Sequence, residues 1–242
     1  MYYNNYNTTG ATFDWTYLII LAILFIASMV AQSAVQKRYK QYSTVYARSG
    51  ITGAEAAQRI MEANGVMDVQ ILQKNGQNLS DYYDPRSNTI HLSSNTYNNP
   101  SVAAIGVACH EAGHAIQYAK NYSPVKLRMA MIPFSNTCSK LAIPLILIGF
   151  ILSGFAEHLK IVALVGIILY AVAVFVQLVT LPVEFDASRR ALANIRSCGI
   201  LAEDEAKGAK SVLSAAAMTY VVAMLTSVVQ LIRLISMYNR RR

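Results

Sequence analysis

The chain has 242 residues, of which 54% are hydrophobic and 14% are charged, and its formal net charge is +8. So small a share of charged residues is unusual for a soluble domain and indicates a membrane protein of one or two domains. The basic residues cluster at the ends of apolar runs, which favours an anionic lipid surface over nucleic acid as the partner. The cysteines lie far apart and form no C-x-x-C pair, so no disulfide role is expected.

The first apolar run begins close to the N-terminus. Residues 1–14 are rich in Tyr, Asn and Thr, and we expect a disordered tail outside the cytoplasm. Residues 15–36 are apolar and long enough for a transmembrane anchor. Basic residues follow this run rather than precede it, so it is not a signal peptide. The positive-inside rule then places the N-terminus outside and the following chain in the cytoplasm.

Residues 37–140 form the main soluble portion, for which we expect a small α+β domain. Thr52, followed three residues later by Glu55, predicts a capping box at the start of a helix that ends near Ala63. Alternating apolar and polar residues and turn-forming residues then predict a strand, a turn and a hairpin. These elements are expected at residues 66–72 (strand), 75–76 (turn), 79–83 and 88–92 (hairpin strands), and 84–87 (hairpin turn).

The zinc-hydrolase pattern H-E-x-x-H follows in His110-Glu111-Ala112-Gly113-His114. Ser101 is the expected N-cap of its helix, which should end near Lys120. Residues i and i+4 share one face of a helix, so both imidazoles can point at one cation, and Glu111 can reach its water as a general base. Composition alone predicts about 0.002 such matches, which disfavours the alternative of histidines that are merely exposed or packed.

Residues 141–182 contain two further apolar runs, joined by a tight charged loop at 157–160. They predict a hairpin of transmembrane helices with its loop outside, preceded by a short linker at 126–140. Because the hairpin returns to the cytoplasm near Pro182, a new helix should begin just after that proline.

The last segment, residues 183–242, should hold that helix and a C-terminal apolar helix at 212–235. The C-terminal helix is long enough to span a bilayer. However, it has a polar stripe, and a fourth span would place the three terminal arginines outside. A helix at the interface or on the zinc domain would keep them inside. We slightly favour a membrane-embedded helix, so the sequence predicts three or four spans.

A hydrolytic zinc site needs a third protein ligand and an open position for water. Glu184 is the best candidate, because both ends of the hairpin return to the membrane face that carries the zinc-pattern helix. Asp186 is the fallback ligand. His91, in a predicted strand, and His158, on the opposite side of the membrane, are weaker candidates. Without a metal, Glu184 would serve as a first-turn acid of its helix or as an ion-pair partner.

Four segments together resemble a known family: Tyr83-Asp84-Pro85-Arg86, Ile90-His91-Leu92-Ser93, His110 to Gln117, and Glu184 to Ser188. With the anchor and the hairpin, they make the chain resemble the membrane-bound neutral zinc metallopeptidases of the YugP type. The chain is more distantly similar to the gluzincin membrane proteases that include HtpX and the CAAX prenyl endopeptidases. The resemblance implies one Zn²⁺ per chain held by His110, His114 and Glu184, with Glu111 as the catalytic base.

The resemblance also bears on the surroundings of the metal. In the distant relatives the third-ligand motif is Glu-x-x-Ala-Asp, and its aspartate orients a zinc histidine. Ser188 stands at that place here, so Ser188 or Asp186 is expected to orient the histidine. An edge strand upstream of the zinc helix holds substrate by β-addition in such proteases, and residues 88–93 are expected to do so here. The candidate donors to the oxyanion are Tyr82, Tyr83, Arg189 and Arg190.

We therefore expect a mainly α membrane protein with a zincin-like α+β cytoplasmic domain and a small β-hairpin or sheet. Its expected function is a zinc-dependent endopeptidase of the cytoplasmic membrane that cleaves membrane or membrane-proximal proteins at the cytoplasmic face. The bilayer and a protein or peptide substrate are the expected partners. Partner proteins in the membrane and a homo-oligomer are further possible partners. The alternative function is a non-proteolytic scaffold or assembly factor with a structural or degenerate zinc site. A transporter built on Gln230 and Arg233 is a weaker alternative.

Overall fold

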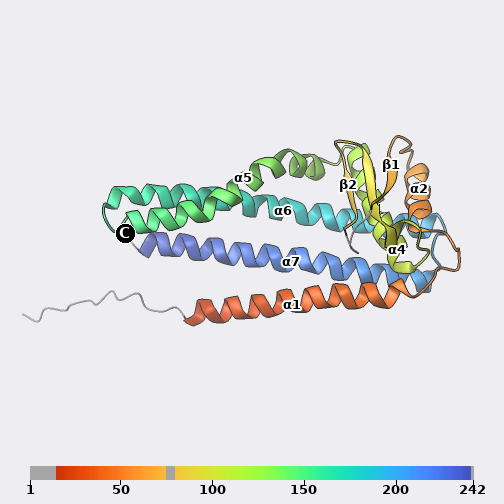
Figure 1. Ribbon diagram of the computed structural model, residues 1–242, viewed down its shortest axis with the longest axis horizontal. Helices are drawn as coiled ribbons and strands as arrows, with labels where there is room; N and C mark the ends of the chain where they lie inside the picture. The colour runs from red at the N-terminus through yellow and green to blue at the C-terminus, as the bar shows by residue number, and fades with distance from the viewer. Residues whose placement is uncertain (1–14, 75–79, 241–242) are drawn as a thin grey trace, which may run out of the picture.

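Long helices make up most of the molecule. The computed structural model describes residues 15–74 and 80–240; the expected tail at 1–14, the turn at 75–76 and the first residue of the predicted hairpin, Leu79, lie outside these ranges. Four long helices run side by side, and a small unit of short helices and strands lies at one end of them (Figure 1). The predicted mainly α architecture with a small sheet is confirmed.

Among the described residues, 4 helices are long and apolar enough to cross a membrane. The predicted anchor forms the first of them and continues beyond its apolar part, through the basic residues that follow. The four helices are α1 (Trp15–Ser43), α5 (Ser123–Leu152), α6 (Lys160–Ser197), which is preceded by the short η1 (Glu157–Leu159), and α7 (Glu203–Arg240).

Helices α5 and α6 form the predicted hairpin, and small residues allow their backbones to approach closely. A Cβ on Gly149 would overlap the backbone of Ala163 on the opposite helix. A Cβ on Gly166 would lie 2.7 Å from Cγ1 of Ile146, which is also closer than packed atoms allow. Close contact through small residues is a common way for helices to associate in a membrane, where lipid and protein are equally apolar.

Two helix boundaries that were predicted near prolines are wrong, because the prolines lie inside continuous helices. The predicted linker at 126–140 is wrong, because α5 already begins at Ser123 and contains Pro133 and Pro144 within it. Figure 1 shows α5 bent along its length rather than interrupted, as prolines in a helix produce. The predicted restart after Pro182 is also wrong, since α6 continues unbroken to Ser197. Packed neighbouring helices stabilise such prolines in membrane proteins.

Helix α7 lies along the bundle, antiparallel to α1, and not across its end (Figure 1). Polar residues near its C-terminal end contact α1: the Tyr17 hydroxyl donates to Gln230, and the Arg233 guanidinium lies 4.6 Å from the centre of the Tyr17 ring. At the same end, the Lys160 ammonium lies 4.5 Å from the centre of the Tyr238 ring. Part of the polar stripe that made this helix ambiguous is therefore paired inside the bundle.

The small unit begins with α2 (Gly53–Ala63), and its predicted capping box is confirmed. The Glu55 N–H donates to the Thr52 hydroxyl at 3.3 Å, and the Thr52 N–H donates to the Glu55 carboxylate at 2.7 Å. The strand after it begins later than predicted, because Val66 belongs to the end of the helix: its N–H donates to the Met61 carbonyl at 2.9 Å. Gly65, with φ of +75°, makes that turn.

The three strands are β1 (Gln70–Lys74), β2 (Tyr82–Asp84) and β3 (Thr89–Ser93), in the order β1-β3-β2. The predicted hairpin is confirmed as the antiparallel pair β2 and β3, and β1 joins β3 in parallel. The strand predicted to bind substrate, residues 88–93, forms β3 and is therefore the central strand. Both of its sides are already paired, so the expectation that it is a free edge is wrong.

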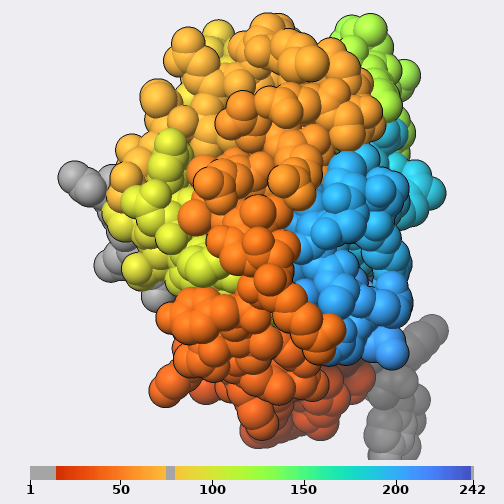
Figure 2. All heavy atoms as spheres, turned by 90° about the vertical axis from the view of Figure 1, so that its right-hand side faces the viewer, coloured from red at the N-terminus to blue at the C-terminus, as the bar shows by residue number. Residues whose placement is uncertain are grey.

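Helix α4 (Val102–Ala119), which carries the zinc pattern, follows the short α3 (Ser94–Tyr97) and lies in the core. Its predicted N-cap is confirmed, because the Ser101 hydroxyl accepts from the Ala104 N–H at 3.3 Å. Figure 2 shows the end of the molecule, where the segment after α1 lies against the start of α7. An ion pair of 2.6 Å between Arg48 and Asp204 joins them there.

Candidate metal centre

The two histidines of the zinc pattern project from one face of α4. Their ring centres lie 4.7 Å apart, and the rings are nearly perpendicular. His114 is 9% exposed, and the His110 side chain is 16% exposed. The structure therefore places both rings side by side near the surface of the core, as the i, i+4 spacing predicts.

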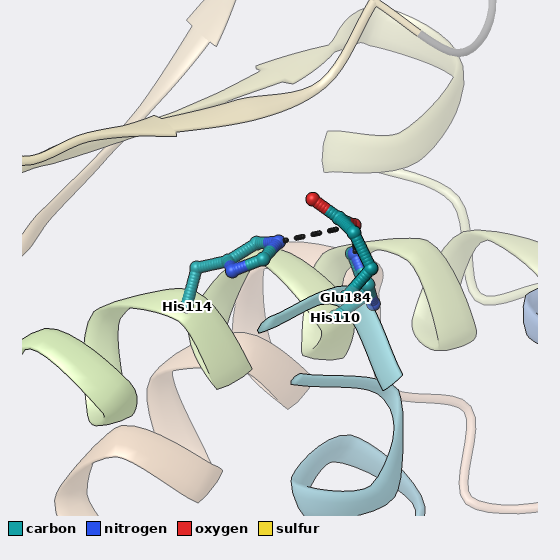
Figure 3. A group of neighbouring side chains, drawn as sticks. All are labelled: His110, His114 and Glu184. Atoms are coloured by element: carbon teal, nitrogen blue, oxygen red, sulfur yellow. Dashed lines mark hydrogen bonds and ion pairs between the residues drawn. The ribbon is translucent and has the colours of Figure 1, made fainter. Parts of the chain in front are cut away.

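The carboxylate of Glu184 reaches both rings from α6 (Figure 3). Its Oε2 lies 3.3 Å from Nε2 of His110 and 3.6 Å from Nε2 of His114. One candidate ligand atom from each of these three residues lies within 4.8 Å of the other two. We call His110, His114 and Glu184 the metal group. Two imidazole nitrogens and one carboxylate oxygen are the donor set of a hydrolytic zinc site, so these residues fit the predicted metal.

A glycine inside the zinc pattern lets α4 and α6 approach each other. A Cβ on Gly113 would lie 2.6 Å from the Ala187 carbonyl oxygen, closer than such atoms come in folded proteins. Gly113 lies between the two histidines, and Ala187 lies one turn after Glu184. The absence of a side chain at this position therefore brings the carboxylate within reach of both rings.

Each histidine has a hydrogen-bond partner on its other ring nitrogen. The Ser188 hydroxyl lies 3.1 Å from Nδ1 of His110. Of the two residues expected to orient a histidine, Ser188 and Asp186, it is therefore Ser188 that contacts His110 directly. Gln117 places its Oε1 3.1 Å from Nδ1 of His114. Because an amide oxygen only accepts, Nδ1 of His114 is the donor in this contact, and Nε2 is the ring nitrogen that faces the Glu184 carboxylate.

Gln117 was not predicted from the sequence, although its position three residues after His114 places it on the same side of α4. Its amide nitrogen donates to the Val183 carbonyl at 2.8 Å and to the Asp186 carboxylate at 2.9 Å. These two bonds fix which way the amide points. Asp186 therefore acts on His114 through Gln117.

The other candidates lie elsewhere. Asp186, the fallback ligand, is not in the metal group, because its carboxylate is bound by Arg189 and Arg190 in addition to Gln117. His91 stacks on the Tyr82 ring with 4.8 Å between centres. His158 lies in η1, at the loop of the hairpin and the far end of the bundle.

Four residues were predicted as candidate donors to the oxyanion. Two of them, Arg189 and Arg190, form ion pairs with Asp186. The Tyr83 hydroxyl donates to Asn88 at 2.8 Å, and Tyr82 stacks on His91.

Glu111 lies beside the metal group and is held by the edge strand. The backbone N–H of Tyr83 in β2 donates to its Oε2 at 3.0 Å. Burial raises the pKa of the Glu111 carboxyl to about 7, with the Glu184 and Asp81 carboxylates adding to the rise and His110 opposing it. A carboxyl group whose pKa is near neutrality can both take up and release a proton.

Arg128 of α5 is a further residue that the sequence did not reveal. Its guanidinium lies 3.3 Å from Oε1 of Glu184, the carboxylate oxygen that is turned away from the histidines. The arginine falls in the segment that was expected to be a linker, so no pattern placed it near the metal group. It neutralises part of the buried negative charge and fixes the orientation of the carboxylate.

Comparison with known proteins finds relatives that match most of the chain. The model of a family described as "Putative neutral zinc metallopeptidase" matches residues 17–239. The chain is 44% identical over 215 residues to the "Putative membrane protease YugP" of Bacillus subtilis (strain 168), which covers 89% of this chain and 93% of that protein. No solved structure matches the chain significantly.

These matches extend over almost the whole chain, and with the four apolar helices they identify a multi-pass membrane protein whose metal is zinc. The chain belongs to the family "Putative neutral zinc metallopeptidase".

Proposed function

We propose that this protein is a membrane-anchored zinc endopeptidase that hydrolyses peptide bonds of membrane or membrane-proximal proteins. In this proposal His110, His114 and Glu184 hold the zinc ion, and Glu111 is the catalytic base. The observation that carries it is the convergence of two Nε2 atoms and one carboxylate oxygen beside the Glu111 carboxylate. The catalytic portion then combines residues 37–140 with the part of α6 that follows Pro182, and the membrane hairpin, residues 141–182, connects the two.

Zinc bound at the metal group supplies a Lewis acid that polarises a peptide carbonyl and lowers the pKa of water toward about 7. The remaining work falls to the side chains. Glu111 accepts a proton from the attacking water and later gives it to the leaving amine nitrogen. The Tyr83 N–H holds one of its oxygens, which leaves the other free to face the water.

The partners of the histidines support the ligand roles. A histidine that binds zinc usually donates its second N–H to an oxygen, which fixes the ring and makes the binding nitrogen more basic. The Ser188 hydroxyl and the Gln117 amide oxygen stand at those second nitrogens. Ser188 therefore takes the place of the aspartate of the distant relatives.

The proposed substrate strand is β2 rather than β3. Strand β2 lies at the edge of the sheet beside α4, and its Tyr83 N–H points to Glu111. An extended peptide laid along this edge would have its backbone next to the catalytic carboxylate.

We further propose that the metal group faces the cytoplasm. The small unit and the metal group lie at one end of the four-helix bundle, while η1 and the end of α7 lie at the other (Figure 1). Basic residues flank the membrane helices mainly at the end with the metal group, which the positive-inside rule assigns to the cytoplasm. They are Lys37, Arg38, Lys40, Lys120, Lys126, Arg189, Arg190 and Arg196. The ends of α1 and α7 that lie away from the metal group then face outside.

The proposal is tested by zinc content and cleavage in detergent-purified protein, with a library of unstructured peptides analysed by mass spectrometry. Glu111→Gln should keep about one zinc per chain and lose cleavage by about a thousandfold or more. Glu184→Ala should lose both zinc and cleavage. Glu157→Gln, in η1, is the matched control and should lose neither.

Cleavage that survives in Glu111→Gln would contradict the base assignment, and zinc that survives in Glu184→Ala would contradict the ligand assignment. A wild-type protein that binds zinc but cleaves nothing, with Glu111→Gln indistinguishable from it, would support the scaffold alternative.

A further inference from the structure

A cavity of about 210 Å³ opens from the metal group into the bundle between α1, α4 and α7. We call it the membrane-side pocket. Its floor is formed by His110, Glu111 and Glu184. Its walls are mostly aliphatic and small: Val35 of α1, Val107 of α4, and Val212, Leu213, Ala216 and Ala217 of α7.

A second cavity, of about 160 Å³, meets the metal group from the side of β2 and α5 and is lined by Tyr82, Tyr83 and Arg128. The same three floor residues line both cavities, and so do Asp81 and Tyr220. The metal group is therefore accessible from two sides. One side is polar and lies along the edge strand, and the other is apolar and lies within the bundle.

Building on the proposed function, we propose that the membrane-side pocket binds a bulky apolar side chain of the peptide substrate, next to the bond that is cut. Its volume exceeds the ~150 Å³ of an apolar protein cavity that accommodates benzene. A leucine or phenylalanine side chain therefore fits, whereas alanine would leave most of the space unfilled. Hydrophobic pockets beside a reacting bond set specificity in this way.

The polar groups at the pocket favour a peptide over the acyl chain of a lipid. Asp81 accepts from the Ser93 N–H at 2.7 Å through Oδ1, but its buried Oδ2 has no hydrogen-bond partner among the described residues. A buried carboxylate oxygen without a donor is costly, so its partner is expected in the bound state. The N–H of a substrate peptide supplies such a donor at the junction of the two cavities, and an acyl chain does not.

The position of the pocket along α1 also restricts the substrate. Val35 stands at the end of the apolar run, immediately before the basic residues Lys37, Arg38 and Lys40. That change from apolar to basic marks the level of the bilayer surface. The preferred substrates are thus segments that leave the bilayer and carry a large apolar residue at its surface.

The test uses peptide hydroxamates that share one backbone and carry an Ala, Leu or Phe side chain next to the zinc-binding hydroxamate. Their affinity for the zinc-loaded, detergent-purified full-length protein is measured by calorimetry. We expect Leu and Phe to bind at least about tenfold more tightly than Ala. Ala216→Phe fills the pocket and should abolish this preference, so that the Ala, Leu and Phe hydroxamates bind with similar affinity.

Ala215→Phe is the matched control: the neighbouring residue does not line the pocket, so the preference should persist. Val107→Ala enlarges the pocket and should raise the affinity for Phe relative to Leu, which decides the matter if Ala216→Phe does not fold.

Hydroxamates that bind with equal affinity in wild type, with no change in Ala216→Phe or Val107→Ala, would overturn the pocket assignment and leave the metallopeptidase proposal intact. A phospholipid that copurifies with wild type, is absent from Ala216→Phe and is not displaced by the Leu hydroxamate would overturn it in favour of a lipid site. A protein that binds zinc but none of the hydroxamates would overturn the proposed function, and this inference with it.

Discussion

Replacing Gly113 by alanine should separate the metal group from its third member. The new Cβ would lie 2.6 Å from the Ala187 carbonyl oxygen, and both atoms belong to helix interiors that have no flexible end to move aside. Helix α6 must therefore retreat by roughly half an ångström, at a cost of about 1–3 kcal/mol. The gain of about 1 kcal/mol in helix propensity from glycine to alanine offsets part of this cost.

Because Glu184 lies three residues before Ala187, the retreat withdraws its carboxylate from both imidazoles. We expect zinc affinity to fall by about ten- to hundredfold, the range seen when the support of a metal ligand is disturbed. The affinity is measured by competition with a chelator in detergent, and stability by thermal unfolding of the metal-free protein.

Gly106→Ala is the matched control, because it makes the same substitution on the same helix. Its Cβ would meet Cβ of Ala209 at 3.3 Å, a contact that a small shift can relieve. This variant should keep its zinc affinity and lose little stability. Equal zinc affinity in Gly113→Ala and wild type would refute the idea that this close approach positions Glu184.

Three further substitutions test other contacts. Ser188→Ala removes the hydroxyl from Nδ1 of His110 and should weaken zinc binding about tenfold or more in the same competition assay, whereas an unchanged affinity would deny it an orienting role. Arg128→Gln leaves Oε1 of Glu184 without its cation and should destabilise the metal-free protein by about 2 kcal/mol in thermal unfolding, whereas an unchanged stability would show that the ion pair does not support the carboxylate. Thr52→Ala breaks the capping box and should cost about 1 kcal/mol without altering zinc content; altered zinc content would show that α2 supports the metal group.

The sequence by itself determined the features that depend on neighbouring residues. The apolar runs predicted the membrane helices by length alone, and Thr52 with Glu55 predicted a helix start. The four-residue spacing of His110 and His114 placed two candidate ligands on one helix face. Glu184 was predicted too, but only through the hairpin that returns it to the same end of the bundle.

Only the tertiary structure decided which distant residues meet and which strand is free. Arg128 reaches Glu184 because α5 continues through the segment that was predicted to be a linker. The role of Gln117 depends on the packing of α4 against α6, which brings its amide to the Asp186 carboxylate. Strand β3 is central because β1, which precedes the hairpin in the sequence, pairs with the edge of β3 that β2 leaves open. Local patterns encode the period and length of an element. They do not encode its neighbours, since these follow from how closely small residues such as Gly113 let separate helices pack.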